Sequence, residues 1–136
     1  MIRPYRSEDF AAIDAWWQHG IDTYERPSKR WSEFVLSAEN VTCICEIAGD
    51  EIRGFAQYDV YDADAWVGIV VSPAHRRKGV AAALLKAVEL RAMDENIRRI
   101  SVSIEPTNHP ALSLVTSRRF TFAGEEEGFL LYELNI

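Results

Sequence analysis

The chain has 136 residues, of which 48% are hydrophobic and 26% are charged, a composition typical of one folded domain with a buried core. Its 15 basic and 21 acidic residues give a net charge of −6, which argues against general binding to nucleic acid or anionic membranes. No apolar run is long enough to span a membrane, and the first residues are charged where a secretory signal would be apolar. We therefore expect one domain over residues 1–136, located in the cytoplasm.

The first third of the sequence predicts a short strand followed by two helices. Residues 2–5 can form an edge strand, and Ser7 is expected to cap a first helix that stops near Gly20. Pro27 suits the first turn of a second helix. The predicted buried face of that helix consists of Trp31, Phe34, Val35 and Ala38.

The rest of the sequence alternates between strand-like and helical patterns. The first two strands are joined by the turn Gly49-Asp50, which predicts a hairpin, and Pro73 ends the third strand. The predicted strands are 41–48, 52–61, 65–71, 97–104, 120–123 and 129–134, and the predicted helices are 79–93 and 110–117. The order β-α-α-β-β-β-α-β-α-β-β predicts an α/β fold with one mixed sheet and helices on both faces.

The two cysteines predict no chemistry of their own. Cys43 and Cys45 lie two residues apart in a strand-like run, so both side chains should point to the same face. Two residues along one strand are too far apart for an easy disulfide, and two thiols without further ligands do not form a zinc site. We expect buried free thiols and no bound metal.

A basic segment joins the third strand of the middle region to the long helix. Arg76, Arg77 and Lys78 stand directly before Gly79, in an otherwise acidic chain. The first turn of a helix has free backbone N–H groups, and the small residues Gly79 and Ala81 let a bulky anion approach the backbone. The pattern suits a phosphate or pyrophosphate, although it is neither the nucleotide-triphosphate loop nor the dinucleotide fingerprint. The alternative is an exposed basic loop that caps a helix and binds nothing.

The segment Arg76-Arg77-Lys78-Gly79-Val80-Ala81 resembles the Arg/Gln-x-x-Gly-x-Gly/Ala signature of the GNAT superfamily of N-acyltransferases. A second segment, from Asn108 to Phe120, is similar to the family's Asn-x-x-Ala-x-x-Leu-Tyr-x-x-x-Gly-Phe pattern. The element order and the length also agree with the family, so the likeness covers essentially the whole chain. The resemblance implies a GNAT-like sheet whose fourth and fifth strands splay apart.

The resemblance also implies acetyl-CoA as co-substrate, with no metal. The pyrophosphate would lie on the N–H groups of the loop, and the pantetheine would run along the end of the preceding strand. Asn108 would reach the pantetheine arm or a water molecule near it. The binding residues implied in this way are Ile69, Val70, Val71, Arg76, Arg77, Lys78, Gly79, Val80, Ala81 and Asn108.

The sequence departs from the family at the positions that carry acid and base. Val115 stands where the family has a Tyr that is proposed to protonate the leaving thiolate, and Arg119 replaces the Gly before the final Phe. In two well-understood branches a Glu lies on the fifth or the fourth strand, and the matching residues here are Ser103 and Ala65.

An amine acceptor must still lose a proton, so some other group is expected to accept it. The residues that could do so, directly or through water, are Asp59, Tyr61, Asp64, Glu105 and Tyr132. We choose Glu105 because it follows the fifth strand near Asn108, and Tyr132 as a replacement for the missing Tyr.

These observations predict an N-acetyltransferase that acts by direct transfer in a ternary complex. The acceptor is expected to be the primary amine of a small molecule or peptide, and the net charge of −6 favours one with a second positive charge. Two alternatives stay open: an acyl-CoA-binding sensor without turnover, and a phosphate-anchored interaction domain. The oligomeric state stays open as well, with a homodimer suggested by the family.

Overall fold

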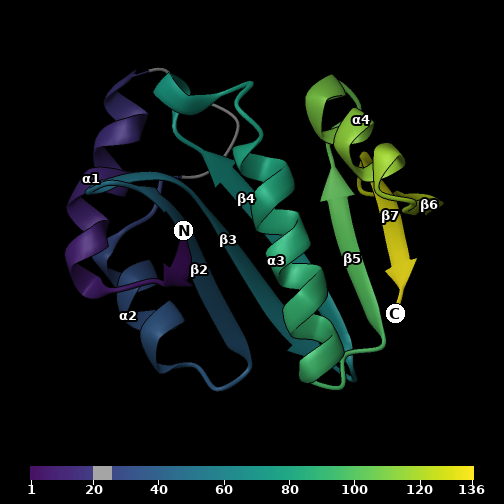
Figure 1. The fold of residues 1–136 in the computed structure, drawn as a ribbon. Helices are drawn as coiled ribbons and strands as arrows, with labels where there is room; N and C mark the ends of the chain where they lie inside the picture. The colour runs from purple at the N-terminus through teal and green to yellow at the C-terminus, as the bar shows by residue number, and fades with distance from the viewer. Residues whose placement is uncertain (20–25) are drawn as a thin grey trace.

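The computed structural model describes residues 1–19 and 26–136. Seven strands form one mixed sheet in the order β1-β2-β3-β4-β5-β7-β6 (Figure 1). Neighbouring strands are antiparallel except β4 and β5, which are parallel. The strands are β1 (Ile2–Pro4), β2 (Val41–Ala48), β3 (Glu51–Tyr61), β4 (Asp64–Val71), β5 (Arg99–Ile104), β6 (Thr121–Glu126) and β7 (Phe129–Asn135).

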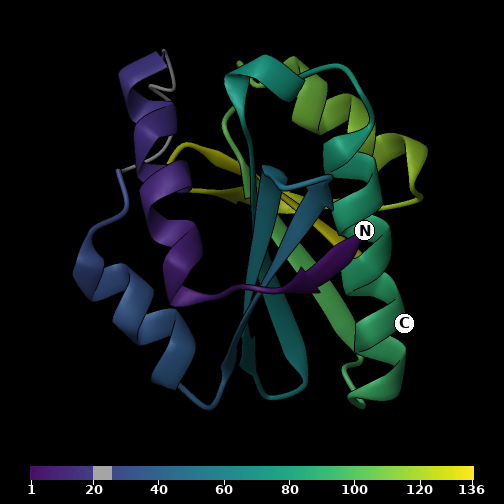
Figure 2. The same cartoon turned by 60° about the vertical axis from the view of Figure 1, so that its left-hand side comes forward.

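The helices cover both faces of the sheet. They are α1 (Phe10–Ala15), α2 (Lys29–Ser37), α3 (Val80–Asp94) and α4 (His109–Ser117), with 3₁₀ turns at Ser7–Asp9, Trp16–His19 and Pro73–His75. Figure 2 shows α1 and α2 on one side of the sheet and α3 on the other. The predicted α/β fold is confirmed. Within residues 1–19 and 26–136, no helix is long and apolar enough to cross a membrane.

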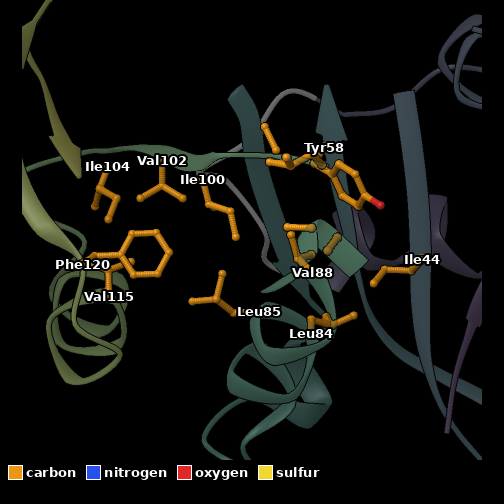
Figure 3. Close-up of a cluster of buried hydrophobic side chains, with 14 of the residues drawn as sticks. Ile44, Tyr58, Leu84, Leu85, Val88, Ile100, Val102, Ile104, Val115 and Phe120 are labelled. Carbon is orange, nitrogen blue, oxygen red and sulfur yellow. The ribbon is translucent and has the colours of Figure 1, made fainter. Parts of the chain in front are cut away.

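Two hydrophobic clusters form the core, one on each face of the sheet. The larger joins α3 and α4 to the strands, and Figure 3 shows it with the α3 side chains Leu84, Leu85 and Val88 at its centre. The smaller lies under α1 and α2 and includes Cys43 and Cys45, which are buried and free as the sequence predicts.

The predicted start of the first helix is wrong in its detail. Ser7 begins a 3₁₀ turn, and its hydroxyl bonds to Glu8. The carboxylate of Asp9 instead accepts the backbone N–H of Arg6 at 2.8 Å, because a charged acceptor satisfies a free N–H better than a hydroxyl. The predicted stop at Gly20 lies outside the described residues.

The second helix also begins later than predicted. Pro27 precedes it, and Ser28 is the cap, with its hydroxyl oxygen accepting the N–H of Trp31 at 3.2 Å. The predicted buried face is partly wrong, since Phe34 is 46% exposed whereas Val35 is buried. The helix is short, so its buried stripe is narrow.

Helix α3 is fixed to β3 at both ends. Near its start, Gly54 lies so close that a Cβ there would be 2.8 Å from Cγ1 of Val80 and 3.0 Å from the carbonyl oxygen of Val70. Beyond its end, the buried hydroxyl of Tyr58 donates to the carboxylate of Glu95 at 2.8 Å. Burial and this bond raise the pKa of Tyr58, which therefore stays a neutral donor. The position of the α3 N-terminus is thus set by the sheet.

We expect Gly54→Ala to lower the free energy of unfolding by about 1–3 kcal/mol, because the added methyl group overpacks the contact between β3 and α3. Gly68→Ala on the neighbouring strand is the control, since a Cβ there meets nothing within 4 Å. That variant should be as stable as the native chain, or more stable by up to ~1 kcal/mol. Urea unfolding measures both. Equal stability of the two variants would contradict the close contact at Gly54.

Candidate functional site

Strands β4 and β5 pair only at one end. Three residue pairs join them, Asp64–Arg99, Ala65–Ile100 and Trp66–Ser101, and no pairing continues beyond. On its other edge, β4 stays paired with β3 as far as Val71. The backbone groups of residues 67–71 that face β5 therefore have no strand partner, and an extended amide-bearing chain could pair with them. The predicted splaying of the fourth and fifth strands is present.

A buried carboxylate holds the paired end together. Asp64 accepts hydrogen bonds from Nη2 of Arg99 and from Oγ of Ser101, both at 2.8 Å and both from β5. Arg99 also lies 3.5 Å from the carboxylate of Glu133 on β7. Asp64, weighed above as a proton acceptor, is therefore engaged in linking the strands.

The basic loop lies between the end of β4 and the start of α3. Arg77 and Gly79 have left-handed backbones, with φ of 62° and 77°, so the chain turns sharply before Val80 begins the helix. The N–H groups of the first helical turn have no partner within the helix and carry the positive end of its dipole. A Cβ at Gly79 would meet nothing within 4 Å, so the space in front of this turn is open.

The loop is also positively charged. Arg76, Arg77 and Lys78 are exposed, and none forms an ion pair with another residue of the described part of the chain. Their charge is available to an anion at the helix start. The side chain of Val80 is only 2% exposed, so this residue can offer an anion its backbone alone.

Asn108 stands at the start of α4, where its Oδ1 accepts the N–H of Ala111 at 3.3 Å. The side-chain oxygen is used as a helix cap. The amide nitrogen is the part of Asn108 left to donate to a ligand.

A cavity of about 380 Å³ lies where β4 and β5 separate, on the sheet face that α2 covers. It is within the size range of small-molecule sites. Its lining combines aromatic rings, apolar side chains and few polar groups. The described lining residues are Pro27, Trp31, Phe55, Gln57, Asp59, Trp66, Val67, Gly68, Ile69, Val70 and Ser103.

The floor of this cavity is built from directly opposed residues of β3 and β4. The pairs are Phe55–Val70, Gln57–Gly68 and Asp59–Trp66, and alternate residues of a strand share one face. Gly68 lies in the middle of the floor and carries no side chain, so the space above it is open.

An ordered hydrogen-bond chain runs from Trp31 of α2 to two residues of the cavity floor. Nε1 of Trp31 donates to Oε1 of Gln57 at 2.8 Å, and Nε2 of Gln57 donates to Oδ1 of Asp59 at 3.0 Å. Because an indole N–H can only donate, the Gln57 oxygen must face Trp31, and its amide group must then face Asp59. The Trp31 ring is held in turn by Tyr5 and Phe55, with ring centroids at 5.2 and 5.3 Å. The Asp59 carboxylate is thereby oriented before any ligand binds.

The structure does not bring the two predicted catalytic residues to this cavity. Glu105 is exposed in the turn after β5, where its carbonyl oxygen accepts the N–H of Asn108 at 2.9 Å. Tyr132 is paired with Val102 and packs on the α3 side of the sheet. Of the five proton acceptors weighed from the sequence, Asp59 is the one that lines the cavity.

Sequence reasoning missed Trp31, Trp66 and Gly68 as parts of a site. The signal that could have identified them is the alternation of side chains along two paired strands, which places residues 55, 57 and 59 opposite 70, 68 and 66. Using this signal requires the register of the hairpin, which composition and periodicity do not fix.

The comparisons with known proteins agree with this geometry. The model of the acetyltransferase (GNAT) family matches residues 5–120. A search of curated proteins finds no match. Among solved structures, an N-acetyltransferase from Staphylococcus aureus Mu50 is 21% identical, with a TM-score of 0.84 and coverage of 99% of this chain and 97% of that chain.

Two further structures have the same fold. A ribosomal-protein-alanine N-acetyltransferase from Brucella melitensis is 15% identical, with a TM-score of 0.85 and coverage of 100% and 99%. The PaiA N-acetyltransferase from Thermoplasma acidophilum, solved in complex with coenzyme A, is 16% identical, with a TM-score of 0.84 and coverage of 100% and 98%. Since the family model spans most of the sequence and the fold agrees throughout, the chain belongs to the GNAT acetyltransferase family.

Proposed function

We propose that the protein is an N-acetyltransferase that transfers the acetyl group of acetyl-CoA to a primary amine. The observation that carries the proposal is the meeting of three features at the end of β4: the cationic loop before α3, the unpaired edge of residues 67–71, and the cavity behind that edge. The structural relative from Thermoplasma acidophilum was solved with coenzyme A, which supports the same donor here.

In this proposal the loop and the strand edge hold the acyl donor. The N–H groups of Gly79, Val80 and Ala81 and the side chains of Arg76, Arg77 and Lys78 bind the pyrophosphate. The backbone of Ile69, Val70 and Val71 and the amide of Asn108 bind the pantetheine arm. When bound, acetyl-CoA would supply an acetyl thioester: the amine nitrogen forms a bond to the carbonyl carbon, the C–S bond breaks, and the coenzyme A thiolate leaves.

The chain itself offers no thiol for a covalent step. A hydrogen bond with Cys45 and burial raise the pKa of Cys43, and both residues are buried in the core on the α1–α2 face. A protonated, buried thiol is a poor nucleophile. Direct transfer, in which the protein positions the amine, is the route that its residues support.

Asp59 is the group that we propose to receive the proton of the acceptor ammonium, directly or through water. It lines the cavity, and Gln57 holds its Oδ1, which leaves Oδ2 for the amine. Glu105 and Tyr132 remain the residues proposed from the sequence for proton transfer, directly or through water.

An acyl-CoA-binding sensor without turnover is the second candidate. The observation that favours it is Val115, which replaces the family Tyr and is 3% exposed within the hydrophobic cluster on the α3 side. Release of free thiol from acetyl-CoA, measured across a panel of amines, separates the two functions. Thiol release with at least one amine supports the enzyme. Binding of acetyl-CoA without release for any amine supports the sensor.

Acetyl-CoA at a hundred times its dissociation constant should stabilise the native protein by about 2.7 kcal/mol. Gly79→Glu should abolish this stabilisation, because its carboxylate would occupy the space in front of the helix start. Gly128→Glu is the matched control: Gly128 is also left-handed, with φ of 84° and nothing within 4 Å of a Cβ, but it lies between β6 and β7. Thermal unfolding with and without acetyl-CoA checks both. Equal ligand stabilisation of the two variants would refute the loop as the pyrophosphate site.

Asp59→Asn should lower kcat for the best amine by about 10²–10⁴-fold, which is the usual contribution of a positioned proton acceptor. Asp62→Asn is the control, since Asp62 lies in the exposed turn after β3 and outside the cavity. Glu105→Gln and Tyr132→Phe complete the series under saturating acetyl-CoA. A large loss in either of these two, with Asp59→Asn unaffected, would return the role to the residues chosen from the sequence.

A further inference from the structure

The cavity between β4 and β5 has a chemistry that restricts the acceptor. Among its described lining residues, Asp59 carries the one charge. The rest of the lining on the α2 face is dominated by the rings of Trp31, Phe55 and Trp66 and by the aliphatic side chain of Val70. A ligand that fills it meets one carboxylate, the neutral polar groups of Gln57 and Ser103, and otherwise apolar surface.

We propose that the acceptor is a primary amine on a short, uncharged, apolar or aromatic body. This inference rests on the proposed function, because it assigns the substrate class of the same site. The ammonium group lies against Asp59, and the body lies over Gly68 between the two tryptophan side chains.

The carboxylate of Asp59 has one oxygen free to bind a cation. Gln57 occupies Oδ1 of Asp59 at 3.0 Å, and Oδ2 has no hydrogen-bond partner among the described residues. Trp66 is the direct cross-strand neighbour of Asp59 and is 37% exposed, so its ring can also contact a cation bound at the carboxylate. A second ammonium group on the acceptor would find no second carboxylate in the described lining and would lose hydration without compensation.

The same lining disfavours an acceptor with a carboxylate of its own. No basic residue is among the described lining residues, so an acidic group would lie near Asp59 without a partner. The local charges therefore argue differently from the net charge of −6, which had favoured an acceptor with two positive charges. We give more weight to the residues that line the cavity than to the net charge, because interactions at contact distance exceed the screened field of distant surface charges.

The absence of a side chain at Gly68 leaves the space that the acceptor body would occupy. A Cβ built there meets nothing within 4 Å, and Gly68 does not have a left-handed backbone. Larger side chains can therefore be added without backbone strain, and they would project into the space that the body occupies. The position offers a steric test that leaves the charge and the loop unchanged.

The test is equilibrium binding to the protein saturated with coenzyme A, which allows no turnover, measured by calorimetry near neutral pH. The probes are 2-phenylethylamine and three matched compounds: phenylalanine adds a carboxylate, 2-phenylethanol lacks the ammonium group, and 1,4-diaminobutane replaces the ring by a second ammonium group. We expect 2-phenylethylamine to bind at least about tenfold more tightly than each of the other three, since a charge-assisted hydrogen bond contributes on that scale. Equal or tighter binding of the diamine or the amino acid overturns the inference.

Variants locate the binding. Asp59→Asn should weaken 2-phenylethylamine about tenfold and leave 2-phenylethanol unchanged, whereas Asp62→Asn should change neither. Gly68→Val and Gly68→Leu should weaken 2-phenylethylamine progressively while acetyl-CoA still raises the melting temperature. Unchanged amine binding in both folded Gly68 variants places the amine elsewhere and refutes the assignment.

The two proposals fail in different ways. Thiol release with 1,4-diaminobutane but not with 2-phenylethylamine would leave an acetyltransferase and overturn the acceptor class. Tight binding of 2-phenylethylamine without thiol release for any amine would support the class of ligand and overturn the transfer reaction.

Discussion

The buried carboxylate of Asp64 is the constraint on which the rest of the site depends. It accepts two hydrogen bonds from β5, from Arg99 and Ser101, at the one end where the parallel strands meet. A parallel ladder of three pairs is weak alone, and these charge-assisted bonds reinforce it. Because the strands are tied at that end only, their other ends can diverge while the sheet stays continuous.

The divergence creates two different surfaces from one strand. The edge of β4 beyond Trp66 presents backbone groups toward β5, while the α2 face of the same strand forms part of the cavity floor through Trp66, Gly68 and Val70. Helix α3, seated on β3 by the contact at Gly54, places its N-terminus beside the end of β4. In the proposed function, donor and acceptor are therefore both positioned by β3, β4 and α3, and α2 contributes Trp31 to the cavity lining.

The regular elements could be predicted from the sequence because their patterns are local. The strand 41–48 and the long helix after Gly79 follow from alternation and from 3.6-residue spacing. The helix starts were less predictable, since Ser7 and Asp9, or Pro27 and Ser28, can each mark the start, and only the hydrogen bonds of the folded chain show that Asp9 and Ser28 accept the backbone N–H groups. Arg119, which stands where the family has Gly, keeps a left-handed backbone with φ of 70°, a conformation that a glycine adopts without strain and an arginine does not.

The candidate site likewise has a part that the sequence predicts, the basic loop, and a part that it does not, the cavity. The loop from Arg76 to Ala81 is one continuous segment, so its charge and its glycine could be interpreted without knowledge of the fold. The cavity is assembled from α2, β3, β4 and β5, and its members meet only once the register of β3 on β4 is known. This is why the sequence leaves Asp59 as one of five possible proton acceptors, whereas the structure shows that it is the one of the five that lines the cavity.

The open space above Gly68 also affects how the sequence of such a protein can change during evolution. A residue with free space around it and an ordinary backbone is under little selection from folding, so substitutions there can accumulate by drift. Each would reshape what fits above the strand while the donor loop, some distance along the chain, stays as it was. A single substitution at this position could in this way change the molecules that fit in the cavity without a loss of folding stability.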